Sequence, residues 1–477
     1  MQKRHNAQLN LSLSPLGFGI MRLPMNEDGT FPKKAYKLLA EAYERGINYF
    51  DTAYTYLGGH SEELIRETLV ANYPRESFYI ADKLPVWLCK DKKDMEMIFQ
   101  IQLERLGVDY IDFYLLHGLN RQTWADAYSK GVLDFLTQKK AEGRIRRVGF
   151  SMHDDAKVLK LILDTYSWEF VLLQINYYDW IKQHAHKNYN LLLSYGIPCI
   201  VMEPVGGGRL AKLPDEAEKL LTAHWPNDSA ASLAIRFSAS LPNVAVTLSG
   251  MNDEGQLSEN ISVFSPIIEL SDPEQAMLKN IVEIISRYNT IPCTSCCYCL
   301  DVCPQDIAIS HIFQIYNDCK MFDHSRALDI EYFVIIPESR RADNCTQCNK
   351  CNERCPQKIN IPQLLKKIHN TAVGLSIGLD MERLIKLRTK ETKLVCFGAG
   401  TIGRTILSAL RESGSNADYF CDNAEHLWGN EVDGVLVLSP EQLREMSLSK
   451  NFRVLITSSH ESEIRKQLSK LSIQAGV

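Results

Sequence analysis

Residues 110–117, YIDFYLLH, form an apolar run that ends in a histidine. Seven more runs of similar length and character occur between residues 16 and 250, and helix-like segments separate them. They are LGFGIM (16–21), GINYFDT (46–52), FYIADK (78–83), RRVGFS (146–151), FVLLQIN (170–176), IPCIVME (197–203) and VAVTLSG (244–250). Short apolar strands that alternate with helices indicate parallel βα units.

Eight such units in a stretch of about 250 residues are typical of a closed (β/α)8 barrel rather than an open sheet. We therefore predict an α/β fold with a TIM-type barrel over residues 1–270. LNLSL (9–13) precedes the first unit and is expected to form part of a small hairpin that closes the bottom of the barrel.

Length, composition and net charge limit the kinds of protein that this chain can be. Its 477 residues predict two to four domains, and 45% hydrophobic with 23% charged residues is the composition of a globular protein. The net charge of −5 argues against general nucleic-acid binding. No apolar run reaches the ~18 residues of a membrane span, and the start of the chain does not read as a signal peptide. We expect a cytoplasmic protein that binds neither nucleic acid nor membrane.

Two cysteine runs follow the predicted barrel. CTSCCYCLDVCP (293–304) and CTQCNKCNERCP (345–356) both have the pattern C-x2-C-x2-C-x3-C-P, which bacterial-type ferredoxins use to hold a 4Fe–4S cluster. Eight of the fourteen cysteines lie in these runs, and their thiolates require a reducing compartment. The predicted ligands are Cys293, Cys296, Cys299, Cys303, Cys345, Cys348, Cys351 and Cys355.

The resemblance to two-cluster ferredoxins implies a crossed arrangement, because there the fourth cysteine of each run ligates the other cluster. Cys355 would then complete the cluster of the first run, and Cys303 that of the second. Zinc is the alternative metal, since paired C-x2-C motifs also bind zinc, but two complete runs that each end in proline favour iron. Cys297 and Cys319 are expected to pack, with a role as extra ligand left open.

The remaining sequence divides into three parts. SDPEQAMLKNIVEIISRY predicts a helical linker over 271–290, and an α-rich ferredoxin-like domain with two clusters follows over 291–375. Its halves form a loose repeat separated by a 41-residue insert from Pro304 to Asn344. A short helical segment comes next, and the chain changes character at Lys393.

The last part, residues 390–477, contains KLVCFGAGTIGRTILSALRESGSNADYFCDN (393–423). A strand, a glycine turn, a helix and a second strand predict a small Rossmann-like domain. Gly398, Gly400 and Gly403 form G-x-G-x-x-G, and Asp422 ends the second strand, where it would accept from ribose hydroxyls. The alternative is a domain of this fold whose site is vestigial. A regulatory or docking role fits better than a second active site.

Polar residues end three predicted barrel strands, at the face where such barrels carry their chemistry. These are Asp51, Lys83 and His117, and Tyr56 lies on the loop beyond Asp51. A nearby ammonium favours the phenolate form of tyrosine and lowers its pKa, which is ordinarily about 10. With a carboxylate to hold the lysine and a histidine to steer a carbonyl oxygen, this set can protonate that oxygen while hydride reaches its carbon.

GINYFDTAYTYLGGHSEELIRETL (46–69) resembles the aldo/keto reductase family, whose catalytic tetrad is matched by Asp51, Tyr56, Lys83 and His117. RRVGFS, VLLQIN, PVGGGRL (204–210) and LSGMNDEGQLSEN (248–260) extend the resemblance over about 270 residues. It implies NADP or NAD as cofactor, with the following residues in its site: Ser151, Gln174, Met202, Gly206, Gly250 and Asn260.

Two departures from the family pattern concern this cofactor site. Met202 stands where many members carry an aromatic residue that stacks on nicotinamide. Gly250 and Gln256 stand where members that bind NADPH often carry Lys and Arg. The choice between NAD and NADP is therefore open.

The combination resembles the iron–sulfur subgroup of aldo/keto reductases. It implies an NAD(P)-dependent oxidoreductase for a small-molecule carbonyl or alcohol, joined to electron transfer through two 4Fe–4S clusters. Because a nicotinamide delivers two electrons and a cluster passes one, coupling would need a flavin in this chain or on a redox partner protein. The alternative is an electron-transfer or sensing protein in which the barrel is a non-catalytic scaffold.

Overall fold

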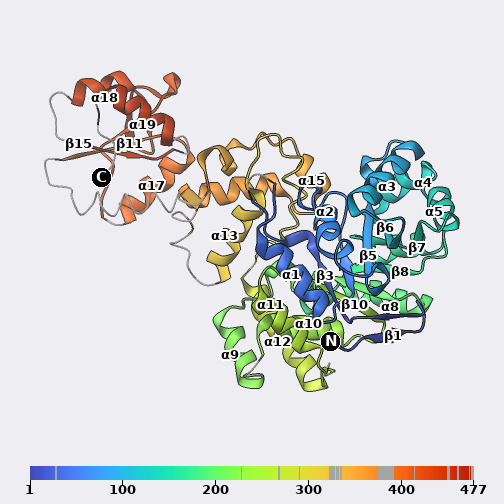
Figure 1. Ribbon diagram of the computed structural model, residues 1–477. Coiled ribbons are helices and arrows are strands. Elements are labelled where there is room, and N and C mark those ends of the chain that lie inside the picture. The colour runs from blue at the N-terminus through green and yellow to red at the C-terminus, as the bar shows by residue number, and fades with distance from the viewer. Residues whose placement is uncertain are drawn as a thin grey trace. The chain divides into compact units, whose positions relative to one another are not determined.

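The structure, a computed structural model, falls into two compact units, Met1–Asn289 and Thr290–Val477 (Figure 1). It describes residues 1–26, 29–226, 228–266, 269–288, 290–321, 328, 332–333, 336–373, 392–412, 414–447, 452–458, 461–471 and 473, with backbone alone for 401, 405, 409, 412, 461 and 462. The helical segment predicted to precede Lys393 lies outside the described residues.

Eight parallel strands close a barrel in the order β10-β3-β4-β5-β6-β7-β8-β9, which confirms the predicted (β/α)8 architecture. The strands are β3 (Leu16–Gly19), β4 (Tyr49–Asp51), β5 (Tyr79–Leu84), β6 (Ile111–Leu119), β7 (Ile145–Met152), β8 (Phe170–Gln174), β9 (Cys199–Met202) and β10 (Val244–Ser249). Each coincides with one of the apolar runs.

An antiparallel hairpin of β1 (Arg4–Asn6) and β2 (Leu11–Leu13) precedes the barrel, as predicted from LNLSL. Leu9 and Leu13 are buried in the same apolar cluster as Tyr49 and Phe113, whose side chains fill the barrel interior. The hairpin therefore closes the end of the barrel opposite the C-terminal ends of the strands.

Side chains alternate between the two faces of each strand, as the pleat requires. Phe113 and Leu115 of β6 pack inside the barrel, whereas Tyr114 and Leu116 pack in the outer core under the helices. Gly149 of β7 has no room for a side chain, because a Cβ there would lie 2.6 Å from the ring and carbonyl oxygen of Phe170.

Helices surround the strands of the barrel unit (Figure 1). They are α1 (Lys33–Glu44), α2 (Ser61–Ile65), α3 (Lys92–Leu106), α4 (Arg121–Ser129), α5 (Val132–Ala141), α6 (Ala156–Leu163), α7 (Tyr177–Lys182), α8 (Ala185–Tyr195), α9 (Asp215–His224), α10 (Ala230–Ala239), α11 (Glu254–Val263) and α12 (Asp272–Arg287). Short turns η2 (Tyr56–Gly59) and η5 (Val86–Leu88) follow β4 and β5.

The helix predicted over residues 271–290 as a linker is present as α12 (Asp272–Arg287), and it packs on the barrel. α12 belongs to the same compact unit as the barrel, and its apolar side, which includes Met277, Ile281 and Ile285, is buried in the outer core. Apolar residues recurring every three or four positions give a helix one water-avoiding face, and here the barrel covers it.

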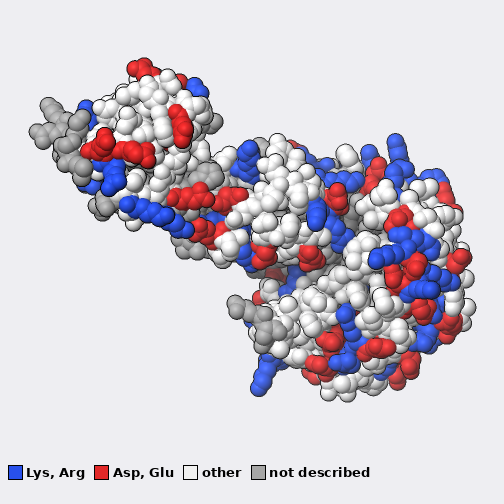
Figure 2. Space-filling view, turned by 90° about the horizontal axis from the view of Figure 1, so that it is seen from above, with Lys and Arg blue, Asp and Glu red and all other residues white. Residues whose placement is uncertain are grey.

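Charged side chains of both signs are interspersed over the barrel unit on the face that Figure 2 shows. Pairs such as Lys160 Nζ with Asp164 Oδ2, at 2.6 Å, are exposed to water. Exposed pairs of this kind add little to stability, because water and salt screen the two charges. The unit is therefore held together mainly by its apolar cores.

The second unit begins with the cysteine region. Its described helices are α13 (Ile309–Met321), α15 (Lys350–Arg354) and residues 361–373, joined by turns η7 (Glu338–Arg340) and η8 (Ala342–Asn344). Ile312, Phe313, Tyr332 and Leu365 form its core together with several of the cysteines. The described part of the 41-residue insert thus supplies α13 and much of this core.

The end of the second unit is a five-stranded sheet of order β13-β14-β12-β11-β15. Its strands are β11 (Lys393–Phe397), β12 (Tyr419–Cys421), β13 (Glu431–Val432), β14 (Val435–Leu438) and β15 (Phe452–Ile456), with helices α17 (Thr401–Glu412), α18 (Pro440–Ser447) and α19 (Glu461–Lys470). All neighbouring strands are parallel except β13 with β14. Numbered along the chain, the four parallel strands lie in the order 3-2-1-4.

In the part of the chain that the structure describes, every helix is too short or too polar to cross a lipid bilayer.

The packing of α12 predicts the effect of truncating it. Ile281→Ala removes a fully buried side chain and should lower the free energy of unfolding of the barrel by about 2–5 kcal/mol. Leu161→Ala, in α6, removes a half-exposed side chain and should change it by less than about 0.5 kcal/mol. Urea unfolding of the full chain, followed by tryptophan fluorescence, compares the two. Equal unfolding midpoints would contradict a structural role for α12.

Candidate active site and cluster ligands

Four side chains predicted to act together do meet at the C-terminal ends of neighbouring barrel strands. Asp51 ends β4, Lys83 lies near the end of β5, and His117 lies near the end of β6. Tyr56 starts the turn η2 just beyond β4. All four side chains are buried, and the most exposed, Tyr56, is only 8% accessible.

Lys83 is the centre of this group. Its Nζ donates to Asp51 Oδ1 at 2.6 Å and to the carbonyl oxygen of Thr52 at 2.7 Å. The same Nζ lies 4.6 Å from the centre of the Tyr56 ring, and that ring lies 5.7 Å from the ring of His117, edge to face. The ammonium therefore lies beside both a carboxylate and a phenol, and an imidazole also contacts the phenol.

Two opposing effects set the charge of Asp51. Burial raises the pKa of its carboxyl group, whereas the charge of Lys83 and the hydrogen bond from it lower that pKa. The positive charge of Lys83 favours the phenolate form of Tyr56 by the same Coulombic effect. Chemically, the arrangement can release a proton from the Tyr56 hydroxyl and stabilise the anion that remains.

Trp87, on η5 directly after β5, was not identified from the sequence. Its ring lies 5.1 Å from the His117 ring, so it forms a wall beside the tetrad. The sequence does contain a sign of it, an aromatic residue four positions after Lys83 and beyond the alternating pattern of the strand.

The residues predicted to bind the cofactor occupy the same end of the barrel. Ser151 is the last residue but one of β7, and its Oγ accepts the N–H of Gly118 at 2.8 Å. Gln174 ends β8, and its Nε2 donates to Asp179 Oδ2 at 2.7 Å. Both side chains are thus held by neighbours that the sequence analysis did not include.

The other members of this predicted set have different settings. Met202 ends β9, and Gly206, with a φ of +58°, lies in the loop that follows. Asn260 of α11 is buried, and its Nδ2 donates to Ser249 Oγ at 2.9 Å. Asn260 therefore ties α11 to the end of β10.

Gly250 lies beside an arginine from another loop. Arg22, which follows β3, packs its aliphatic stem against Gly250, where a Cβ would come within 3.3 Å of the Arg22 Cδ. The Arg22 Nη2 donates to Glu203 Oε1 at 2.6 Å, and Glu203 has a φ of +56°. The cation beside position 250 is therefore Arg22, which comes from a different loop. In the pattern of the family that the sequence resembles, the cation is a residue of the closing motif itself.

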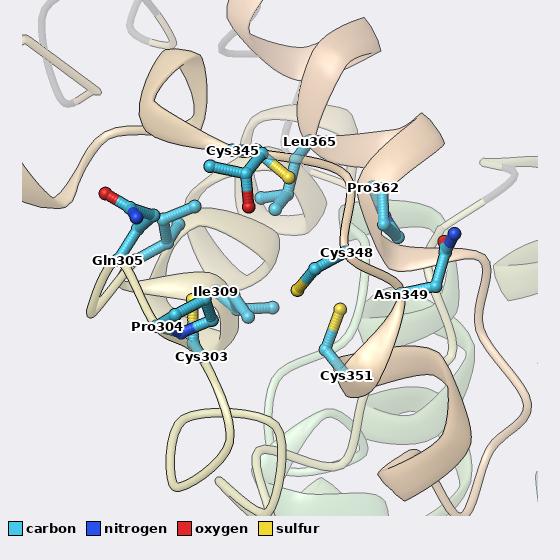
Figure 3. Close-up of a pocket in the computed structure, with 12 residues that line it drawn as sticks. Cys303, Pro304, Gln305, Ile309, Cys345, Cys348, Asn349, Cys351, Pro362 and Leu365 are labelled. Carbon is cyan, nitrogen blue, oxygen red and sulfur yellow. The ribbon is translucent and has the colours of Figure 1, made fainter.

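The eight cysteines of the two runs line two cavities, four to each. The first cavity is lined by Cys293, Cys296 and Cys299 of the first run and by Cys355 of the second. The second is lined by Cys345, Cys348 and Cys351 together with Cys303 of the first run. Figure 3 shows the second set, with the sulfurs of Cys348 and Cys351 directed toward one another. This is the crossed grouping that the ferredoxin pattern implied, and four thiols about one cavity fit a 4Fe–4S cube.

Left-handed backbone conformations bend the two cysteine loops. Ser295 and Cys297 in the first loop and Gln347 and Asn349 in the second all have φ between +51° and +64°. Such residues reverse the direction of the chain, so that three thiols of one short segment can face one cavity. Cys297 is exposed at the border of the first cavity.

Cys319, in contrast, is buried in α13 within the apolar core and lines neither cavity. The expectation of packing therefore holds for it.

The glycine turn after β11 is tightly closed. Gly398 has a φ of +117°, and a Cβ on Gly403 would lie 1.9 Å from the carbonyl oxygen of Gly398. A Cβ on Gly400 would meet nothing within 4 Å among the described residues, so the backbone there is open to an approaching group. Asp422 Oδ2 accepts the N–H of Ala399 at 2.7 Å and therefore braces the turn.

The crossed grouping predicts which cysteine of the other run each cluster needs as its fourth ligand. In a chain carrying Cys345→Ser, Cys348→Ser and Cys351→Ser, about four of about eight irons should remain after anaerobic reconstitution. Adding Cys355→Ser should remove them, whereas adding Cys303→Ser should not.

Iron and sulfide analysis with electron paramagnetic resonance reads out both variants. The reverse result would show that each run completes its own cluster, and zinc in place of iron would contradict the cluster assignment itself.

Comparison with known proteins finds two families, one for the barrel and one for the cysteine region. Residues 15–283 match the model of the aldo/keto reductase family, and residues 287–360 match that of the 4Fe-4S dicluster domain. An aldo-keto reductase of Mycobacterium sp. (strain MCS) is 29% identical over 275 residues, which cover 57% of this chain and 88% of the relative. The NADH-specific methylglyoxal reductase of Escherichia coli (strain K12) is 25% identical over 292 residues, which cover 52% and 87%.

Among solved structures, an aldo-keto reductase from Bacillus halodurans in its holo form matches with a TM-score of 0.50 and 25% identity, over 59% of this chain and 96% of that one. The family match spans more than half of the chain and contains all eight barrel strands. The protein therefore belongs to the aldo/keto reductase family and carries a 4Fe–4S dicluster domain after its barrel.

Proposed function

We propose that this protein catalyses the NAD(P)-dependent reduction of a small-molecule carbonyl compound, or the reverse oxidation of an alcohol. The observation that carries the proposal is the position of the Lys83 ammonium, bonded to Asp51 and 4.6 Å from the centre of the Tyr56 ring in a buried site. Family membership supports the general class of oxidoreductase.

Each member of the tetrad has a distinct role in this proposal. Tyr56 donates its hydroxyl proton to the carbonyl oxygen as that oxygen gains negative charge. Lys83 stabilises the phenolate left behind, and Asp51 keeps Lys83 charged and oriented. His117, whose ring is in edge-to-face contact with that of Tyr56, orients the substrate oxygen toward the phenol.

The residues at the barrel mouth fit a nicotinamide, which when bound supplies the hydride. Ser151 and Gln174 present fixed polar side chains there because Gly118 and Asp179 hold them. Met202, Gly206, Gly250 and Asn260 complete the set proposed for the cofactor. One relative is named as NADH-specific, which makes NADH a candidate alongside NADPH.

The cluster domain is proposed to pass single electrons to or from a redox partner protein. A flavin, bound by this chain or by that partner, would be needed to divide a hydride into single electrons. Because the ligands are thiolates, we place the protein in the reducing cytoplasm. A chain whose barrel is only a scaffold for the clusters is the competing proposal.

For the C-terminal sheet we propose a nucleotide-binding, regulatory role. The support is the open backbone at Gly400, at the N-terminal end of α17, between the close-packed Gly398 and Gly403. Asp422 would bond ribose only if it exchanged its contact with Ala399 for the ligand.

Removing the Tyr56 hydroxyl tests the catalytic proposal. Tyr56→Phe should lower kcat for carbonyl reduction by about 10²–10⁴-fold, because the general acid is lost. Tyr79→Phe is the matched control, since Tyr79 lies at the opposite end of β5 and should leave kcat unchanged. Iron content should be the same in all three proteins. Equal turnover by wild type and Tyr56→Phe would favour the scaffold proposal.

Mixing the anaerobically purified full chain with NADH or NADPH tests coupling between cofactor and clusters. If the clusters exchange electrons with the nicotinamide directly, their visible absorbance should bleach with one or both. If bleaching appears only after a flavin or flavoprotein is added, the electrons pass through that flavin. Absence of bleaching in both cases would contradict electron transfer between the two.

A further inference from the structure

Asp82, the neighbour of Lys83, lies on the other side of the barrel wall. Strand alternation directs Lys83 into the barrel and Asp82 outward to the helices. The register agrees, because Asp82 pairs with Tyr114, which packs in the outer core, whereas Lys83 pairs with Leu115 of the interior. An acid immediately behind the catalytic lysine is therefore enclosed between β5, α2 and α3.

A second carboxyl group meets Asp82 there. Glu62 of α2 and Asp82 are both fully buried, each with one oxygen that has no hydrogen-bond partner among the described residues, and each carboxyl group affects the pKa of the other. Arg105 of α3 reaches Glu62, with Nη1 at 2.9 Å from Oε2. The guanidinium of Arg105 thus bonds to Glu62, whereas Asp82 accepts the main-chain N–H of Lys83.

This imbalance determines the protonation of the pair. Two adjacent carboxylates repel each other in a medium that screens charge poorly, and the charge of Lys83 opposes this only in part, so one carboxyl group keeps its proton. Burial, followed by the charge of Glu62, raises the pKa of Asp82 well above its usual range. Burial raises the pKa of Glu62 as well, but the hydrogen bond and charge of Arg105 oppose that rise, as do hydrogen bonds with Asp82 and Gln102, so we expect Glu62 to be the ionised member.

Two oxygens remain for the shared proton. Asp82 Oδ2 and Glu62 Oε1 are buried and have no other hydrogen-bond partner among the described residues. Asp82 Oδ1 is already occupied by the N–H of Lys83, and Glu62 Oε2 by Arg105. An O–H on Asp82 Oδ2 that donates to Glu62 Oε1 satisfies both.

The same network holds the main chain of Lys83. Asp82 Oδ1 accepts the N–H of Lys83 at 2.7 Å, and Gln102 Nε2 donates to the carbonyl oxygen of Lys83 at 3.0 Å. Gln102 is itself fixed by the hydroxyl of Tyr114, which donates to Oε1 at 2.7 Å. Pairing between β4 and β5 ends at Asp51 and Ala81, so these side chains bond the part of β5 that β4 no longer reaches.

We propose that protonated Asp82 and ionised Glu62, anchored by Arg105, form a carboxyl pair that shares one proton and positions Lys83 for the reaction. Asp82 and Glu62 are positioning residues, since they act on the substrate only through Lys83. The inference rests on the proposed carbonyl chemistry for its kinetic consequence, whereas the shared proton is independent of it.

Other ionisable groups surround the pair. Tyr114 on β6 lies on the same side of the wall as Asp82, and burial raises its pKa well above its usual value, so it stays neutral. The charge of Lys83, on the other side of the wall, acts on Asp82 through space and lowers its pKa. On the opposite side, Tyr54 and Glu63 lie near Arg105. The proton of the pair is therefore the group expected to titrate within the network.

Three variants separate the two carboxyl groups. Asp82→Asn is conservative, because its amide N–H replaces the O–H toward Glu62 and its oxygen still accepts from Lys83. Asp82→Ala removes both bonds, and Glu62→Gln removes the anion that Arg105 and Asp82 require. In carbonyl reduction by the full chain, Asp82→Ala and Glu62→Gln should lower kcat by about 10–100-fold, with little change in KM, and Asp82→Asn should retain most of it.

An infrared measurement tests the proton without reference to activity. The full chain near neutral pH should show the carbonyl stretch of a buried protonated carboxylic acid, which Asp82→Asn should lack. Deuterium exchange should shift that band.

The pH dependence of stability has a definite sign. Because the pKa of Asp82 is raised in the folded state, its proton favours folding at acidic pH, and that stabilisation is lost as pH rises through the raised pKa. The difference in stability between wild type and Asp82→Asn should therefore change in favour of the variant as pH rises.

The shared proton and the positioning role are tested separately. Absence of the band from wild type, or its persistence in Asp82→Asn, overturns the shared proton. Equal loss of kcat in Asp82→Asn and Asp82→Ala overturns the positioning role. If wild type and Tyr56→Phe turn over alike, the proposed function fails, and the infrared result still decides whether the proton is shared.

Discussion

Lys83 and Asp51 are two opposite charges removed from water at the end of a barrel. Burying either charge alone would cost several kcal/mol, and their mutual attraction offsets that cost only when geometry and further hydrogen bonds are good. The 2.6 Å bond between them and the bond from Lys83 to Thr52 meet that requirement. Strands β4 and β5 must therefore end in register, and the position of Tyr56 on the next turn follows from theirs.

The outer side of β5 meets the same constraint in a different way. There the guanidinium of Arg105 bonds to Glu62, and we infer that the neighbouring Asp82 is neutralised by a proton rather than by a cation of its own. Inner and outer networks share the peptide of Lys83, and helices α2 and α3 thereby act on a side chain that they do not touch. Helix packing and site geometry are coupled through that one residue.

The cluster domain shows a comparable dependence between distant segments. Each cavity takes three thiols from one loop and one from the other, so neither loop can build a cluster alone. The insert between the runs contributes α13 to the core that both loops pack on. A cluster bound in either cavity would therefore join the two loops, so that metal binding favours the folded form of both.

The sequence alone determined the parts of this protein that depend on local pattern. Strand positions follow from runs such as YIDFYLLH, the four catalytic candidates follow from polar residues at strand ends, and the cluster ligands follow from fixed cysteine spacing. Only the tertiary structure decided the parts that depend on which surfaces meet. The apolar face of α12 is equally compatible with a linker helix in the sequence, and only the tertiary structure shows that the barrel covers it. Glu62, Asp82 and Arg105 are 20 or more residues apart in sequence and look like ordinary surface charges, because no local pattern records that three elements bury them together.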